Sequence, residues 1–128
     1  MSATPYPCPC CGHQVFAEPP GSDDICMICF WEDDATQLRF PRLADATNVV
    51  SLTEAQQNYA RFGAIEERFA GDVRKPEVSD VLDPGFRPLS EGDPFETGAI
   101  DDAEGPSDLT ALYYWRPTYW RSAANKPA

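Results

Sequence analysis

The middle of the chain carries apolar residues at the spacing of an amphipathic helix. They recur every three or four positions, at Leu52, Ala55, Tyr59, Phe62, Ile65 and Phe69. Just ahead of them, Ser51 and Glu54 have the spacing of a capping box, in which each side chain bonds an amide left free by the first helical turn. The pattern predicts a helix over residues 52–69 with one face in the core, and Gly63 marks a weak point or kink within it.

The N-terminal third shows shorter periods, typical of strands and turns. Residues 14–17, with the sequence QVFA, alternate as a strand does, and residues 19–22 combine two prolines with a glycine and a serine, which favours a turn. We expect residues 14–17 to form a strand that turns at 19–22 and pairs with the stretch leading to Cys26.

Residues 109–121 form an aromatic element with five aromatic side chains. Alternation along it supports a strand, whereas a cap at Ser107 or Asp108 and a stop before Pro117 support a short helix, and periodicity alone leaves both open. The rings can close the core, or they can join the arginines in a contact surface, because tyrosine, tryptophan and arginine dominate binding hot spots.

Residues 77–108, the acidic segment, differ from the rest of the chain in composition. They carry ten acidic side chains and one basic one, together with four prolines and four glycines. Such a segment buries too little apolar surface to offset the entropy of ordering it. We expect a loop that is held where Phe86, Leu89 and Phe95 reach apolar surface.

Length and composition limit the size of the core and the number of domains. A chain of 128 residues with 13 prolines and 8 glycines has room for a loop-rich fold with one modest core. No apolar stretch is long enough to cross a bilayer, and the first residues lack the basic start and apolar run of a signal peptide. We expect a single domain over residues 1–128, located in the cytoplasm and without membrane contact.

Two CxxC pairs carry the strongest chemical signal. Cys8 and Cys11 form the first pair, Cys26 and Cys29 form the second, and fourteen residues separate the pairs. Each pair can turn two sulfurs toward one ion, so the spacing predicts a structural Zn²⁺ site in a zinc-ribbon-like module at 6–35. Iron in a rubredoxin-like site and dithiol redox chemistry are the alternatives. Four thiolates fill a tetrahedron and leave no position for catalysis at the metal.

Three other groups lie near these cysteines in sequence. Cys10 falls outside the CxxC spacing, and we expect it to be a spare thiol. His13, the single histidine, could replace a thiolate, bond to one, or simply belong to the hairpin. The acidic run at residues 32–34 has neither an EF-hand pattern nor a partner histidine, and we interpret it as a solvated turn or an interaction patch.

These motifs resemble the bacterial cysteine-rich CPCC family of small zinc-ribbon-like proteins. The matching stretches are YPCPCCG at 6–12, ICMICFWEDD at 25–34, QLR at 37–39, NVVSL at 48–52 and NYARFGA at 58–64. The resemblance covers residues 6–75 and implies a metal-binding module without a settled activity. It does not extend to the acidic segment or the aromatic element.

Charge and motifs narrow the function. The net charge is −11, which disfavours nucleic acids because they are bound largely through lysine and arginine. Motifs of serine hydrolases, phosphate-binding loops and zinc proteases are missing from the sequence, so we do not expect an enzyme. A zinc-ribbon nucleic-acid-binding or regulatory protein is the alternative to a protein-binding module.

These features together predict an α+β fold, in which a small zinc-ribbon-like β-hairpin module packs on one main amphipathic helix and a loop-rich acidic C-terminal extension follows. We expect a protein-binding module for a basic partner such as a toxin, similar in type to small acidic immunity proteins. The expected contact residues lie in the aromatic element and the acidic segment, at Tyr113, Tyr114, Trp115, Tyr119, Trp120, Asp101, Asp102 and Glu104.

Overall fold

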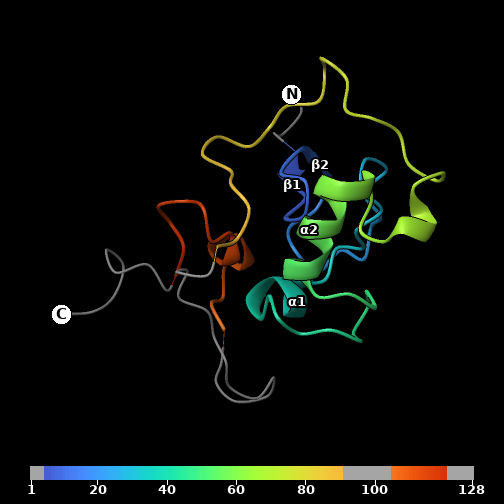
Figure 1. The fold of residues 1–128 in the computed structure, drawn as a ribbon. Helices are drawn as coiled ribbons and strands as arrows, with labels where there is room; N and C mark the ends of the chain where they lie inside the picture. Colours follow the sequence, from blue (N-terminus) through green and yellow to red (C-terminus); the bar gives the residue numbers. More distant parts are fainter. Residues whose placement is uncertain (1–4, 91–104, 121–128) are drawn as a thin grey trace.

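The computed structural model describes residues 5–90 and 105–120 and shows a small α+β protein (Figure 1). Its elements in chain order are β1 (Tyr6–Pro7), β2 (Gln14–Phe16), α1 (Ala35–Arg39), α2 (Leu52–Phe62), and the 3-10 helices η1 (Glu67–Phe69) and η2 (Leu109–Leu112). A two-stranded hairpin, one main helix and a cluster of four cysteines confirm the predicted fold class. None of the described helices is long and apolar enough to cross a membrane.

β1 and β2 form an antiparallel hairpin around the first CxxC pair. Tyr6 lies opposite Phe16 and Pro7 opposite Gln14, with an irregularity in the register between the two pairs. The predicted pairing of residues 14–17 with the stretch leading to Cys26 is therefore wrong. The first CxxC pair already turns the chain back on itself, and pairing with the nearest segment costs the least loop-closure entropy.

A second antiparallel pairing surrounds the other CxxC pair. Ile25 bridges to Glu32. The pairing continues outward, because Asp33 donates its amide to the carbonyl of Asp24 at 2.8 Å and accepts at its own carbonyl from Asp23 at 3.1 Å. Each CxxC pair thus lies at the tip of its own short hairpin.

Two of the three acids at 32–34, Asp33 and Asp34, are structural, which corrects the interpretation of this run as a solvated turn or an interaction patch. Asp33 is 2% exposed, and its carboxylate accepts from the amide and the hydroxyl of Ser22, the latter at 2.7 Å. Asp34 caps α1 by accepting from two amides of the first turn, with the shorter bond, 2.7 Å, from Thr36. Aspartate turns inward here because its short carboxylate reaches free amides at turns and helix starts.

α2 begins as predicted and ends earlier than predicted. Ser51 Oγ accepts from the amide of Glu54 at 3.1 Å, which confirms the part of Ser51 in the capping box. The helix stops at Gly63, which is left-handed with a φ of 80° and donates its amide to the carbonyl of Tyr59 at 2.9 Å. The predicted continuation to residue 69 is wrong, because a left-handed glycine turns the chain out of the helical path.

The chain beyond α2 folds onto the second CxxC hairpin. Ile65 donates its amide to the carbonyl of Cys29 at 2.9 Å, and Phe69 in η1 stacks on Phe30 with ring centroids 4.5 Å apart. Asn58 supports this turn, since its Nδ2 donates to the carbonyl of Ile65 at 2.8 Å. The apolar period that runs on past α2 in sequence therefore continues the core through a turn and not through a longer helix.

A buried pair of amide side chains holds the long loop between α1 and α2. Gln37 is fully buried, and its Nε2 lies 3.0–3.1 Å from the carbonyl oxygens of Leu43, Asn48 and Val50. Its Oε1 accepts from Nδ2 of Asn48 at 2.9 Å. Both side chains belong to stretches that carry the family resemblance, QLR and NVVSL, and these stretches serve the fold.

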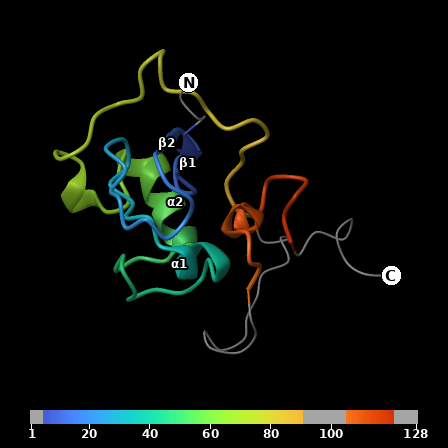
Figure 2. The same cartoon turned by 180° about the vertical axis from the view of Figure 1, so that it is seen from behind.

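The core lies between α2, the two cysteine hairpins and the aromatic element. Its largest fully buried side chains include Trp31, Tyr113, Ile28 and Leu52. Phe86 and Leu89 pack against it from the acidic segment, as predicted, whereas Phe95 lies outside the described residues. In both views the described half of the acidic segment arches over the β1–β2 hairpin from the side of η1 toward η2 (Figures 1 and 2).

The aromatic element begins with η2, which decides between the strand and the short helix. Asp108 caps this helix by accepting from the amide of Thr110 at 3.0 Å. η2 packs against α1, and Trp120 donates its amide to the carbonyl of Ala111 at 2.9 Å. Over residues 109–120 the element is a short helix followed by turns.

Candidate metal centre

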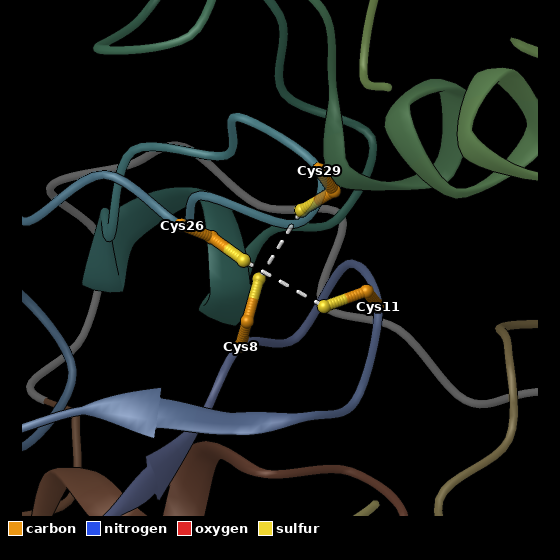
Figure 3. A group of neighbouring side chains, drawn as sticks. All are labelled: Cys8, Cys11, Cys26 and Cys29. Atoms are coloured by element: carbon orange, nitrogen blue, oxygen red, sulfur yellow. Dashed lines mark hydrogen bonds between the residues drawn. The ribbon is translucent and has the colours of Figure 1, made fainter. Parts of the chain in front are cut away.

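The two CxxC hairpins bring four cysteine sulfurs together (Figure 3). Cys8 and Cys11 approach from one hairpin, Cys26 and Cys29 approach from the other, and the four side chains point toward a common centre. All four Sγ atoms lie within 4.8 Å of one another, with Cys8 and Cys29 at 3.6 Å and Cys11 and Cys26 at 3.7 Å. Both of these short distances join one hairpin to the other.

The first hairpin holds its cysteines on a hydrogen-bonded turn. Cys8 donates its amide to the carbonyl of His13 at 2.9 Å and accepts at its own carbonyl from Gly12 at 2.7 Å. Gly12, directly after Cys11, has a φ of 81°, a left-handed conformation that glycine adopts without a steric penalty. This turn presents both sulfurs of the pair on one side.

The second hairpin repeats this turn with the same hydrogen bonds. Cys26 donates its amide to the carbonyl of Trp31 at 2.8 Å and accepts at its own carbonyl from Phe30 at 2.7 Å. Phe30, directly after Cys29, has a φ of 77°, which strains a residue with a Cβ atom. Stacking of its ring on Phe69 offsets part of this strain. Two segments that share little beyond CxxC therefore adopt one geometry.

The spacing of the four sulfurs fits a tetrahedral metal ion. Four sulfurs at about 2.3 Å from zinc lie about 3.8 Å apart, close to the 3.6 and 3.7 Å of the two cross-hairpin pairs. A disulfide needs about 2.05 Å, and all five cysteines are free thiols. The cluster can therefore hold a metal ion with little rearrangement of the hairpins.

Burial sets the protonation of the cluster in the metal-free chain. Loss of hydration raises the pKa of Cys8 and of Cys29 well above the ordinary value. The pKa of Cys11 is lowered instead, because the thiols of Cys26, Cys29 and Cys8 form hydrogen bonds with its sulfur. The cluster thus retains protons that a divalent cation must displace on binding.

Cys10 and His13 lie beside the cluster. Cys10 is 3% exposed and is not one of the four clustered cysteines, which agrees with the prediction of a spare thiol, and burial raises its pKa. His13 belongs to the first hairpin, where its carbonyl accepts from the amide of Cys8 at 2.9 Å, and the nearby sulfur of Cys11 raises the pKa of the imidazole. Of the roles left open for His13, the hydrogen bond to Cys8 supports that of a hairpin residue.

The residues predicted for a partner surface differ in how far the structure buries their side chains, and some of them lie outside the described residues. Three of the rings are at most 9% exposed, namely Tyr113, Trp115 and Tyr119. Two rings are half-buried, namely Tyr114 and Trp120. The three acids lie outside the described residues, namely Asp101, Asp102 and Glu104. Three rings thus serve the core, which is one of the two roles that the sequence left open, and two retain surface for a partner.

Asp83, which no sequence pattern marked, ties the aromatic element to the first hairpin. Its carboxylate is 2% exposed and accepts from Gln14 Nε2 at 3.0 Å, Trp115 Nε1 at 2.7 Å and Arg116 Nη2 at 2.8 Å. Burial alone would raise the pKa of Asp83, but the bonds from Arg116, Trp115 and Gln14 outweigh burial and hold this pKa below its ordinary value. The turn sequence DPGF is the only local signal at this position.

Phe86 covers the turn of the first CxxC pair at close range. A Cβ atom on Gly12 would lie 2.3 Å from Phe86 Cδ2, so the ring rests directly on the glycine backbone. Asp83 donates its amide to the carbonyl of Gly12 at 2.8 Å, and Trp115 meets the ring of Phe86 edge-on with centroids 4.8 Å apart. Residues from the acidic segment and the aromatic element thus cover the first CxxC hairpin.

Gln56 in α2 makes a second set of hydrogen bonds between the first CxxC turn and the C-terminal extension. Its Nε2 donates to the carbonyl of Pro9 and to the hydroxyl of Tyr114, both at 2.9 Å, and its Oε1 accepts from the amide of Leu89 at 2.8 Å. The hydroxyl of Tyr114 in turn donates to the carbonyl of Arg87. One buried side chain therefore connects the main helix and the first CxxC turn to the acidic segment and to the aromatic element.

Fold and site together define a small α+β protein with the four-cysteine cluster typical of a zinc ribbon. One protein family, described as cysteine-rich CPCC, has a model that matches residues 6–80. Since this match covers more than half of the 128 residues, the chain belongs to the cysteine-rich CPCC family, which confirms the resemblance in its motifs. No curated protein matches the chain.

The family match ends before the residues that cover the first hairpin. Asp83 and Phe86 lie beyond residue 80, yet they contact Gln14 and Gly12 inside the matched region. The described part of the C-terminal extension therefore belongs to the same core as the family module.

Proposed function

We propose that the chain is a structural zinc protein with one Zn²⁺ held by Cys8, Cys11, Cys26 and Cys29. The observation that carries this proposal is the four-sulfur cluster, whose members are at most 4% exposed and whose spacing fits a tetrahedral ion. The bound ion would cross-link the two hairpins, and a site of this kind contributes about 10–16 kcal/mol of apparent binding free energy to folding. Because four protein ligands leave no position for a substrate at the metal, we propose that the ion has no catalytic role.

Metal analysis of freshly purified, reduced protein tests zinc against iron. Zinc in four thiolates leaves the protein colourless, whereas iron in the same setting gives visible absorption bands. The proposal predicts a colourless protein with stoichiometric zinc. Stoichiometric iron would assign the cluster to a rubredoxin-like site instead.

The second part of the proposal is a protein-binding function, in which the chain acts as an immunity protein that neutralises a basic toxin. Its support is the net charge of −11 and the concentration of ten acidic side chains against one basic side chain in residues 77–108. Charge of one sign speeds encounter with a partner of the other sign. Tyr114 and Trp120 keep part of their rings accessible and are the aromatic anchors of this proposal.

Contacts within the described residues already engage some acidic side chains of the acidic segment, which reduces the number available to a partner. Asp83 is buried in its own network, and Asp80 pairs with Arg74 at 2.7 Å. The proposal therefore assigns the electrostatic contact to the later acids, chiefly Asp101, Asp102 and Glu104.

Association kinetics with a captured basic partner test this assignment. Reversal of Asp101, Asp102 and Glu104 to lysine is expected to slow association about tenfold at low salt and to leave dissociation nearly unchanged. A matched control reverses three exposed acids outside the acidic segment: Glu18, Glu67 and Asp72. Equal slowing by both triple variants would show that net charge acts without a defined surface.

Protection of cells tests the immunity role itself. Co-expression of the chain is expected to restore growth to cells that produce a basic toxin encoded beside its gene, and the lysine variant is expected to protect less. Growth arrest despite binding of that toxin would contradict immunity and would leave a protein-binding module of another kind.

The alternative, a zinc-ribbon nucleic-acid-binding or regulatory protein, has one supporting observation. Arg61 and Arg68 are exposed and lie over the rings of Phe62 and Phe69, a pairing of cation and aromatic ring that also occurs in single-strand binding. Retention of single-stranded nucleic acid that weakens steeply with salt would favour this alternative. Absence of retention at low salt would remove it.

A further inference from the structure

A half-open cavity lies between α2, the second CxxC hairpin and residues 70–76. Its volume is about 480 Å³, within the range of about 300–1,000 Å³ that small-molecule pockets occupy. Most of its wall is apolar or aromatic, formed by Ile28, Tyr59, Phe62, Ala70, Val73 and Pro76. Cavities beside Asn48 and beside Leu112 measure only about 100 and 220 Å³.

The charge at this cavity is opposite to that of the chain. Arg74 and Lys75 belong to its lining and no acidic residue does, although the chain as a whole carries −11. Arg74 is engaged by Asp80 through two bonds of 2.7 and 2.9 Å. Lys75 is therefore the lining cation that remains for a ligand, and an anionic group is its complement.

Hydrogen bonds and a ring contact attach the walls of the cavity to the second CxxC hairpin. Arg74 donates its amide to the carbonyl of Met27 at 2.9 Å, which attaches residues 70–76 to the second CxxC hairpin. Asp72 donates its amide to the carbonyl of Phe69 at 2.9 Å, and Phe69 stacks on Phe30 of the same hairpin. A preformed wall spares a ligand the free energy of ordering it.

We propose that this cavity binds a small amphipathic carboxylate. The apolar body of the ligand lies against Ile28, Phe62 and Val73, and its carboxylate bonds to Lys75. Ile28 stands between Cys26 and Cys29 in sequence, so the ligand also contacts the turn that carries two of the clustered sulfurs. This site is independent of the proposed protein partner.

A titration of the full-length, reduced, zinc-loaded protein with octanoate tests the site, with amide signals followed by nuclear magnetic resonance. Octanoate is expected to shift the amide signals of Ala60, Gly63 and Val73 in a saturable manner. The neutral analogue 1-octanol should shift the same signals with about tenfold weaker affinity, because it lacks the charge-assisted bond to Lys75. Absence of saturable shifts, shifts confined to other residues, or equal affinities for the two compounds would overturn the proposal.

Two pairs of variants separate the charge from the apolar wall. Lys75→Gln is expected to weaken octanoate about tenfold and to leave 1-octanol unchanged, whereas Arg42→Gln removes a cation outside the lining and should change neither. Ala60→Leu fills part of the cavity from α2 and should weaken both compounds, whereas Ala17→Leu adds the same bulk at an exposed site outside the lining. Equal effects within either pair would contradict binding in this cavity.

Discussion

Asp83 and Arg116 form a two-point ion pair between residues 33 positions apart. Arg116 Nη2 donates to Asp83 Oδ1 at 2.8 Å, and Arg116 Nε donates to Asp83 Oδ2 at 3.0 Å. The Asp83 side chain is 2% exposed and that of Arg116 is 29% exposed. Since Gln14 of β2 bonds the same carboxylate, this pair anchors the aromatic element on the first CxxC hairpin.

Replacement of Asp83 by asparagine is expected to lower the free energy of unfolding by about 2 kcal/mol, because it leaves donors of Arg116 and Trp115 poorly paired in the interior. Chemical denaturation of the zinc-loaded protein measures this loss. The matched control is Asp80→Asn, which weakens the pair with Arg74, whose side chain is 45% exposed, and should change stability less, since solvent at Arg74 screens that pair. Similar losses in the two variants would contradict the anchoring role of Asp83.

Close packing of Phe86 on the first CxxC turn predicts that Gly12→Ala is more harmful than Gly63→Ala. Both glycines are left-handed, with φ of 81° and 80°, so both variants carry the same backbone strain of about 1 kcal/mol. A Cβ atom on Gly12 also meets the ring of Phe86, whereas one on Gly63 meets nothing within 4 Å. Overpacking should add about 1–3 kcal/mol to the loss in Gly12→Ala. Thermal unfolding that ranks the two variants equally would disprove the contact.

Zinc binding is expected to release at least two protons per ion at neutral pH. Burial raises the pKa of Cys8 and of Cys29 in the metal-free chain, so both thiols are protonated there and must lose their protons to bind the metal. Affinity should therefore rise as the pH rises toward these pKa values and fall as the pH drops. Calorimetric titrations in two buffers of different ionisation enthalpy count the protons. Cys10→Ser should leave the count unchanged, and a loss of one proton in that variant would make Cys10 a ligand.

Features that depend on local sequence could be predicted, and the cysteines show this most clearly. The CxxC spacing alone places Cys8 beside Cys11 and Cys26 beside Cys29. The geometry of each turn then depends only on the four residues of its own CxxC motif. The cap of α2 at Ser51 is also local. The sequence does not show where α2 ends, because the apolar period continues past Gly63. Periodicity alone does not distinguish a longer helix from a turn whose side chains pack into the same core.

Long-range features could not be predicted. Asp83 bonds Gln14 and Arg116, which lie 69 and 33 residues away, and nothing in the composition around Asp83 identifies these partners. The buried roles of Asp33 and Asp34 in the acidic run at 32–34 could not be predicted for a related reason. An aspartate looks solvated in sequence until the structure shows the free amides that it meets, such as that of Ser22 beside Asp33.

Metal content across cysteine variants shows most directly whether the two CxxC pairs hold a structural zinc ion. Elemental analysis of freshly purified, reduced protein should find about one zinc per chain in the wild type and in Cys10→Ser. Cys8→Ser and Cys26→Ser should each lose the metal and most of the folded signal, because the ligands lie on different hairpins. Wild-type protein that is folded without metal, or zinc that depends on Cys10 as much as on Cys8, would contradict this account.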